Sequence, residues 1–449
     1  MTRRRVLELL GWGGAGCAMY GVSRTKLLDF LYADADAFDG FTVMRRPYAP
    51  EPGRDISVLG YGGIRLPIKN RSKNQIDEKL GLALIDYAYR HGINYFDTAW
   101  GYHDGEGAKF IGRALKRYPR ESFMLCNKMP PVPVRRAGDG ARIFAEQLKR
   151  CQVDYFDTYL LHSVCDPAQY QFVYKELKTL DYLKAEREKG RIRHLGFSFH
   201  GRSDFLEQVL DDYPWELCLI TVNAIYDRQV PDAARSIKLL QERHIPIFVM
   251  EPLGGGRCAN LNEKAVRILS EARSDSTPAE WALRWALSHE GVQTVLSGMG
   301  RMTWLKENIR SLSAERFQPL TEAEKKTYAL AIDAYMEHTT VPCTGCRYCL
   351  PCPYGVEIPE VFAWWNSFAG AGRLPTRAGE NDSQELRREF LTSYARAIGP
   401  EGGPDRCVQC RKCKLACPQW VFDIPTEMRK IDDALVQVRS DYLQKGGRL

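Results

Sequence analysis

The sequence predicts an α/β protein with two domains: a closed barrel of eight parallel strands surrounded by helices, and a smaller domain behind it. Three observations predict this architecture. Short β-branched runs alternate with amphipathic segments over about residues 55–310, and eight cysteines gather in two groups after residue 340. With 449 residues and 44% hydrophobic content, the chain can bury one large core and still form a second unit.

The strand candidates are eight short apolar runs: Val58–Gly62, Tyr95–Thr98, Phe123–Lys128, Thr158–His162, His194–Ser198, Leu219–Asn223, Ile247–Glu251 and Thr294–Gly298. Helix-like stretches lie between them: Ile76–His91, Ala141–Gln152, Tyr174–Lys189, Ser203–Asp212, Pro231–Arg243, Pro278–His289 and Met302–Leu312. Eight strands that are each followed by a helix close into a TIM barrel. A doubly wound open sheet is the alternative, and it is disfavoured because no G-x-G-x-x-G opens a helix after the first strand.

The cysteines point to metal chemistry in the smaller domain. Of fourteen cysteines, six are isolated, namely Cys17, Cys126, Cys151, Cys165, Cys218 and Cys258. The other eight form the runs Cys343-x2-Cys346-x2-Cys349-x2-Cys352-Pro353 and Cys407-x2-Cys410-x2-Cys413-x3-Cys417-Pro418. A disulfide scaffold spreads its cysteines to connect loops, whereas thiolates spaced two residues apart converge on one ion or cluster.

The second run has the spacing by which three thiolates hold one [4Fe-4S] cluster and the fourth, before proline, reaches a second cluster. Two runs therefore predict two clusters. One would be held by Cys343, Cys346, Cys349 and Cys417, and the other by Cys407, Cys410, Cys413 and Cys352. The first run is one residue shorter before its last cysteine, which leaves the assignment of Cys352 open. A pair of zinc sites is the alternative, but four cysteines closed by Cys-Pro are not a zinc-ribbon layout.

Residues 335–425 resemble the dicluster ferredoxin family on these runs, which implies a ferredoxin-like iron-sulfur domain. The 54 residues between the runs, which include Trp364 and Trp365, are expected to form a helical pair that covers the clusters from water. Three basic residues lie among the predicted ligands: Arg411, Lys412 and Lys414. They either attract an acidic redox-protein partner or form an ordinary solvated surface. The net charge is +7, but the basic residues do not cluster into a stripe along the sequence, so no nucleic acid is expected as a ligand.

Polar residues fall at the carboxyl ends of three consecutive predicted strands, where barrel enzymes place their chemistry. Asp97 ends the second strand and Tyr102 follows one short loop later. Lys128 ends the third strand and His162 the fourth. Each residue alone is weak evidence, but the four in strand order form a specific constellation.

This constellation resembles the acid-base tetrad of the aldo-keto reductase family, and the resemblance covers about residues 54–315. It implies that Tyr102 donates a proton, that Lys128 makes this proton labile, that Asp97 holds Lys128, and that His162 orients a carbonyl. It also implies hydride transfer from NADP(H) or NAD(H), with cofactor contacts from Ser198, Asn223, Met250, Gly298, Arg301, Glu307 and Asn308. Trp304 stands where the family grips a phosphate with arginine, and Arg301 could replace that arginine, which favours NADPH. Gly254, Gly255 and Gly256 indicate either close approach to a phosphate or a plain turn.

A nicotinamide carries two electrons and a [4Fe-4S] cluster carries one. The first hypothesis is an iron-sulfur oxidoreductase that couples redox chemistry of a small carbonyl or alcohol with NAD(P)H to electron transfer through two clusters. The alternative is a ferredoxin-like electron-transfer or redox-sensing protein on a catalytically silent barrel. A third possibility is an enzyme whose clusters are only structural.

The N-terminus resembles a twin-arginine export signal. Residues Thr2-Arg3-Arg4-Arg5-Val6-Leu7-Glu8 precede a Gly-rich apolar run from Leu9 to Val22. That pathway exports folded proteins, which suits clusters built before transport, so periplasmic location is expected, with a cytoplasmic protein as the alternative. No transmembrane segment is expected, because no run of 18 apolar residues occurs. The expected domains are an N-terminal arm (1–53), the barrel (54–325), the cluster domain (335–425) and a helical tail (426–449).

Overall fold

The computed structural model describes residues 40–69, 72, 74–230, 232–338, 340–375, 381–417 and 422–448. The twin-arginine motif at Thr2–Glu8 lies outside these residues. The chain divides into two compact units. The barrel unit holds the described residues up to Leu253 together with Asp275–Lys325, and the cluster unit holds Gly254–Ser274 and the residues from Lys326 onward. The segment Gly254–Ser274, which lies within the expected barrel range of 54–325, groups with the cluster unit.

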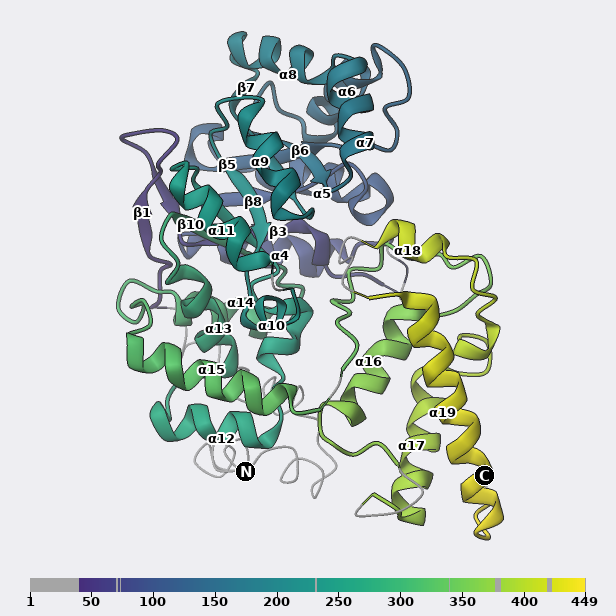
Figure 1. The fold of residues 1–449 in the computed structure, drawn as a ribbon. Helices are drawn as coiled ribbons and strands as arrows, with labels where there is room; N and C mark the ends of the chain where they lie inside the picture. Colours follow the sequence, from purple (N-terminus) through teal and green to yellow (C-terminus); the bar gives the residue numbers. More distant parts are fainter. Residues whose placement is uncertain are drawn as a thin grey trace. The chain divides into compact units, whose positions relative to one another are not determined.

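Eight parallel strands close into a barrel in the order β10-β3-β4-β5-β6-β7-β8-β9 (Figure 1). This arrangement confirms the predicted fold class. The strands are β3 (Leu59–Gly62), β4 (Tyr95–Asp97), β5 (Met124–Met129), β6 (Phe156–Val164), β7 (Ile192–Phe199), β8 (Cys218–Thr221), β9 (Ile247–Met250) and β10 (Val292–Ser297). Each overlaps one predicted run, because β-branched and aromatic residues suit strands that are buried on both faces.

Amphipathic helices connect the strands and pack on the outside of the barrel. They are α4 (Glu78–Arg90), α5 (Glu106–Leu115), α6 (Asp139–Cys151), α8 (Thr179–Glu188), α9 (Ser203–Asp211), α10 (Ala224–Gln229), α11 (Ala233–Glu242), α13 (Pro278–Leu287) and α14 (Met302–Ser311). The predicted helix Tyr174–Lys189 is in fact broken. A π-helical turn (Gln171–Glu176) follows the short helix α7 (Pro167–Tyr170), and α8 begins only after Lys178, whose left-handed backbone (φ 54°) interrupts the helix.

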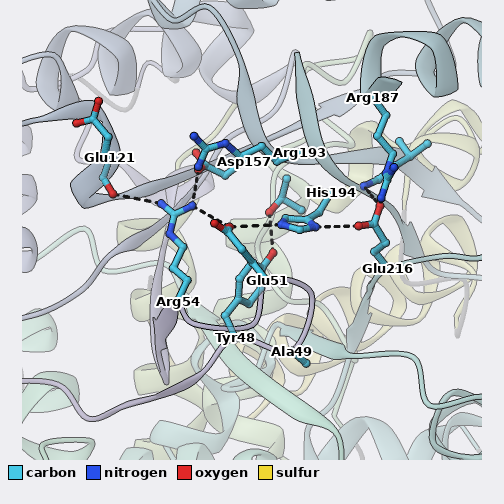
Figure 2. A network of polar contacts seen from close by, with 12 residues as sticks. Tyr48, Ala49, Glu51, Arg54, Glu121, Asp157, Arg187, Arg193, His194 and Glu216 are labelled. Carbon is cyan, nitrogen blue, oxygen red and sulfur yellow. Dashed lines mark hydrogen bonds and ion pairs between the residues drawn. The ribbon is translucent and has the colours of Figure 1, made fainter. Parts of the chain in front are cut away.

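The strands β1 (Arg45–Pro47) and β2 (Asp55–Ser57) pair as an antiparallel hairpin. Strand β1 lies in the expected N-terminal arm, and β2 follows directly after the arm. Its residue Tyr48 is buried among barrel-lining side chains, stacked on Phe248 and edge-on to His194. Figure 2 shows the polar network around it, at residues near the amino ends of the strands. There the buried Asp157 carboxylate forms ion pairs with three arginines, Arg54, Arg120 and Arg193. The hairpin therefore closes the end of the barrel opposite the carboxyl ends of the strands.

The cluster unit is helical over its described residues. After η6 (Gly254–Ala259) and α12 (Glu263–Ala272) it contains most of α15 (Glu322–Met336), then α16 (Ile358–Ala369), α17 (Gln384–Ala397), α18 (Lys412–Ala416) and α19 (Ile424–Gln444). Helix α17 contacts both α16 and α19 (Figure 1), and a shared core of Val361, Phe362, Phe390, Met428 and Ile431 joins the three. Helices α16 and α17 are the pair expected between the cysteine runs. No helix in the described part of the chain is long and apolar enough to cross a membrane.

Candidate active site and cluster-binding residues

The four acid-base candidates lie at the carboxyl ends of neighbouring strands. Lys128 Nζ on β5 donates to Asp97 Oδ2 at the end of β4 (2.5 Å) and to the carbonyl oxygen of Thr98 (2.9 Å). The same Nζ lies 5.1 Å from the centre of the Tyr102 ring. His162 on β6 meets Tyr102 edge-on, with ring centres 6.4 Å apart. The structure thus brings together all four residues that the sequence singled out.

Asp97 and Lys128 form an almost fully buried ion pair. Burial raises the pKa of the Asp97 carboxyl, and the Lys128 ammonium and the Cys126 thiol oppose this rise by binding the ionised form. A buried charge that loses its partner is strongly destabilising. Lys128 therefore favours the ionised form of Asp97, and the ion pair holds both side chains in place beneath Tyr102.

His162 is held in its neutral form. Burial lowers the pKa of its imidazole well below the ordinary value, and the nearby charges of Lys128 and His200 lower it further. A neutral imidazole offers one N–H donor and one acceptor. It can therefore orient a polar ligand atom beside Tyr102 without adding a charge.

A buried polar network fixes the strand that carries Lys128. Gln147 Nε2 on α6 donates to Asn127 Oδ1 (2.9 Å) and to the Lys128 carbonyl oxygen (2.8 Å), while Tyr159 on β6 hydrogen-bonds Gln147 Oε1. Asn127 Oδ1 also accepts from the Lys128 amide (2.8 Å). These side chains are fully buried, so the network rigidifies β5 next to the ion pair.

Two of the expected nicotinamide contacts already have protein partners. Ser198 Oγ accepts from the Ser163 amide (2.7 Å) and lies 3.4 Å from the Leu161 carbonyl oxygen. Asn223 is the N-cap of α10: its Oδ1 accepts from the Tyr226 amide (2.8 Å) and its Nδ2 donates to the Glu251 carbonyl oxygen (3.0 Å). Both side chains hold strand ends in place, and the second amide hydrogen of Asn223 is the donor left to offer a ligand.

The remaining nucleotide candidates lie at the ends of β9 and β10. Met250 ends β9 and packs on the side chains inside the barrel, and Gly298 follows β10. Arg301 is the residue before α14, and its guanidinium stacks on Trp304, which is 40% exposed. Glu307 and Asn308 are the sixth and seventh residues of α14, and Asn308 Nδ2 donates to Ser297 Oγ at the end of β10 (3.0 Å).

The turn after β3 is close to both the ion pair and the β10 loop, which the sequence had not indicated. A Cβ on Gly63 would lie 2.6 Å from the Asp97 carbonyl oxygen. One on Gly298 would meet the aliphatic stem of Arg65 at 2.7–2.9 Å, and one on Gly300 would lie 2.6 Å from the Arg65 carbonyl oxygen. Glycines at these positions let Arg65 lie along the loop that follows β10. The signal in the sequence was the pair Gly62-Gly63, which is separated from Arg65 by Ile64 alone.

The eight clustered cysteines line two cavities within the cluster unit. Cys343, Cys346, Cys349 and Cys417 line the first, which we call the Cys343 cavity. Cys407, Cys410, Cys413 and Cys352 line the second, the Cys407 cavity, where Cys349 also contributes. Both sets of four are the sets expected from the crossover of the two runs, and Cys352 lies with the second run despite its altered spacing.

The thiols in these cavities fit an iron-sulfur cluster. Burial and the neighbouring cysteine charges raise the pKa of Cys349, and the same causes raise the pKa of Cys413 to about 11. Four converging thiolates therefore need positive charge at their centre, which iron supplies. The Gly345 amide also lies 3.4 Å from Cys343 Sγ, as a donor to that sulfur.

Comparison with known families identifies both parts of the chain. Residues 58–325 match the aldo/keto reductase family, and residues 342–422 match the 4Fe-4S dicluster domain. The chain belongs to the aldo/keto reductase family. It is an oxidoreductase of that family which carries a C-terminal 4Fe-4S dicluster domain.

Similar proteins are aldo-keto reductases that align with the barrel. The "Probable aldo-keto reductase 1" of Glycine max is 25% identical over 298 residues, which are 59% of this chain and 83% of that protein. The NADH-specific methylglyoxal reductase of Escherichia coli K12 is 25% identical over 282 residues, 53% of this chain and 84% of the relative. A thermostable aldo-keto reductase crystallised with epalrestat superposes with a TM-score of 0.53 at 25% identity, covering 64% of this chain and 99% of its own. An aldo-keto reductase from Klebsiella pneumoniae in complex with NADPH shares the fold at 19% identity, with a TM-score of 0.51 over 65% of this chain and 95% of its own.

Proposed function

We propose that this aldo-keto reductase reduces a small carbonyl compound, or oxidises the corresponding alcohol, with a nicotinamide nucleotide, and exchanges electrons with two [4Fe-4S] clusters. One observation carries the carbonyl chemistry: the buried Asp97–Lys128 ion pair lies beneath Tyr102, with neutral His162 beside it. This arrangement favours the phenolate of Tyr102, and it therefore favours transfer of the phenolic proton to a substrate oxygen.

Each residue has a defined part in this proposal. Tyr102 gives its phenolic proton to the substrate oxygen as that oxygen gains negative charge, and Lys128 stabilises the resulting phenolate. Asp97 keeps Lys128 charged, and His162 donates a hydrogen bond that orients the carbonyl oxygen. A bound nicotinamide supplies the hydride to the carbonyl carbon, so one hydride and one proton convert carbonyl to alcohol.

The nucleotide would lie across the strand ends that carry these residues. Met250, Gly298, Arg301, Glu307 and Asn308 are the candidate contacts beyond Ser198 and Asn223. The use of a nicotinamide nucleotide is supported by related proteins, since one is named an NADH-specific methylglyoxal reductase and a structural neighbour was crystallised with NADPH. The stacked pair of Arg301 and exposed Trp304 offers a cation and an aromatic face, which suits an adenosine phosphate.

The clusters supply one-electron chemistry beside this two-electron reaction. Two clusters held by the eight cysteines would together take up the two electrons of a hydride from the reduced nicotinamide, one each, and its proton would leave to solvent. That hydride comes from oxidation of the alcohol; in the direction of carbonyl reduction the electrons would flow from the clusters to the nucleotide instead. A redox-protein partner would then exchange these electrons one at a time. Arg411 and Lys414 form ion pairs with Asp423, so this basic segment presents a lower net charge to an acidic partner than its sequence alone suggests.

The decisive experiment uses the full-length protein with its clusters assembled, under anaerobic conditions. NADPH, then NADH, is added while nucleotide binding, cluster absorbance and the EPR spectrum are followed. We expect binding, loss of cluster absorbance and an EPR signal of reduced clusters. With methylglyoxal as the carbonyl probe, nucleotide oxidation should be lost in Tyr102→Phe and retained in Tyr89→Phe, whose hydroxyl donates to Ser122 on the outside of the barrel.

The alternative function makes the opposite forecast. If neither nucleotide binds and neither reduces the clusters, the reductase proposal is wrong, and a ferredoxin-like carrier on a silent barrel remains. Nucleotide oxidation with methylglyoxal in the absence of any cluster reduction would instead retain the barrel chemistry and reject the electron exchange.

A further inference from the structure

The chain makes a detour into the cluster unit directly after β9. Leu253 is the last barrel residue there, and Gly254–Ser274 belongs to the cluster unit before the chain returns to the barrel at Asp275. This detour begins with the turn η6 (Gly254–Ala259), in which Gly254, Gly255 and Gly256 all have positive φ angles of 52°, 70° and 101°. Three successive left-handed residues require glycine, so the turn has a specific shape.

Gly255 packs backbone against backbone on the loop that carries the first cysteines. A Cβ at Gly255 would lie 2.3 Å from the Thr344 carbonyl oxygen, 2.4 Å from its Cα and 2.6 Å from its carbonyl carbon. Thr344 is buried and lies between Cys343 and Cys346. Gly255 therefore serves a close approach, and its partner is the backbone of the cysteine loop.

Further contacts lock the two segments together. Arg257 Nη2 donates to Thr340 Oγ1 (2.8 Å), three residues before Cys343, and Asn260 Nδ2 donates to the Gly256 carbonyl oxygen (2.7 Å). On the other side, Asn366 of α16 exchanges two hydrogen bonds with the backbone of Val341, at 2.8 and 2.7 Å. The cysteine loop is thus held between α16 and the turn after β9.

We propose that Gly255 is a positioning residue for the cluster held by Cys343, Cys346, Cys349 and Cys417. Its backbone fixes Thr344, and so fixes the loop in which the Gly345 amide lies against Cys343 Sγ. Hydrogen bonds to cluster sulfurs and the exposure of the cluster set its reduction potential. The inference rests on the proposed binding of clusters to these cysteines, and it makes a loop of the barrel strand β9 part of the cluster's protein environment.

The test is EPR-monitored redox titration of full-length, cluster-loaded Gly255→Ala. The matched control is Gly399→Ala, because Gly399 has nearly the same φ (72°), lies in the same unit and has nothing within 4 Å of an added Cβ. Cys346→Ser identifies which EPR signal belongs to the Cys343 cavity. We expect Gly255→Ala to change the line shape and midpoint potential of that signal alone, with both signals unchanged in Gly399→Ala. Identical titrations for the two glycine variants would overturn the proposal.

A milder variant covers the case in which Gly255→Ala fails to fold. Arg257→Met keeps an unbranched apolar stem and removes the hydrogen bond to Thr340. Its control is Arg373→Met, which removes an exposed ion pair with Glu389 in the same unit. The same signal should shift in Arg257→Met only. Wild-type protein that assembles no clusters would refute the proposed function instead, whereas two assembled clusters that are insensitive to both Gly255 and Arg257 would refute the positioning role alone.

Discussion

Replacing Lys128 with methionine isolates the buried ion pair on which the active site depends. Lys128 Nζ donates to Asp97 Oδ2 at 2.5 Å and to the Thr98 carbonyl oxygen at 2.9 Å, and both side chains of the pair are almost fully buried. Methionine retains the apolar stem but leaves the Asp97 carboxylate without a charged partner, with only the Cys126 thiol beside it. Removing one member of a buried pair costs about 3–5 kcal/mol. At about 2–4 °C per kcal/mol for a domain of this size, the melting temperature of the barrel should fall by roughly 10 °C.

The double variant Lys128→Met/Asp97→Asn supplies the comparison, because it removes the charge that the single variant strands. A buried pair replaced as a whole is often tolerated, so the double variant should be more stable than the single one at neutral pH. Both variants should lose carbonyl reduction, so stability is the informative readout.

The pH dependence provides a second test of the same reasoning. Burial raises the pKa of Asp97 in the folded protein, and removing Lys128 removes the main opposing charge. An acid whose pKa is higher in the folded than in the unfolded protein binds protons more tightly in the folded state. Its carboxylate therefore does not lower the free energy of unfolding at pH values below its unfolded pKa of about 3.9, and lowers it increasingly as the pH rises toward the folded pKa. The gap between single and double variants should thus be largest near neutral pH and vanish below about pH 4. Urea denaturation followed by tryptophan fluorescence measures it. Equal stability of the two variants at neutral pH would refute the claim that Lys128→Met leaves a destabilising buried carboxylate.

Three further outcomes test other parts of the structure. Arg65→Met should weaken NADPH binding about 10- to 100-fold in calorimetry, because the Arg65 stem packs on Gly298 and the variant would lose one charged hydrogen bond to the nucleotide. Arg65→Lys should recover part of the lost affinity, and an unchanged Kd in Arg65→Met would exclude a phosphate contact. Asp157→Asn should destabilise the barrel by about 3–5 kcal/mol because three arginines lose their buried carboxylate, while kcat/KM stays unchanged at the opposite end of the strands; a loss of activity in the folded variant would contradict this separation. Cys410→Ser should lower the iron content by about half and remove one EPR signal, whereas Cys218→Ser, in the barrel, should retain both signals; full iron in Cys410→Ser would reject it as a ligand.

The barrel and the tetrad could be predicted because their signals are local. Strand runs of β-branched residues end in Asp97, Lys128 and His162, and parallel strands in a barrel bring such ends to one face. The predicted fold and family are confirmed. The roles of individual cofactor residues were harder to predict, since a sequence pattern does not show that Asn223 already caps α10 or that Ser198 bonds to β6.

Long-range contacts explain the features that the sequence did not indicate. Arg65 follows the first barrel strand, yet the glycines that make room for it follow the last one. The sequence analysis did not predict helix α5. Its N-cap residue is the left-handed Gly105, at the end of the turn Tyr102–Gly105, so no capping side chain marks the start of the helix.

The detour after β9 changes how the fusion of barrel and clusters is understood. A cluster domain simply appended to a barrel would exchange contacts only with its own sequence. Here Asn262, at the start of α12, donates to the carbonyl oxygens of Ala334 (3.1 Å) and Gly370 (3.3 Å), and Ala265 and Leu269 of α12 are buried. Helix α12 therefore lies between two barrel segments in the sequence, yet its N-cap residue is hydrogen-bonded to α15 and to the residue after α16 in the cluster unit. The segment that the cluster unit takes from within the barrel's sequence is the one that holds Gly255 against the cysteine loop.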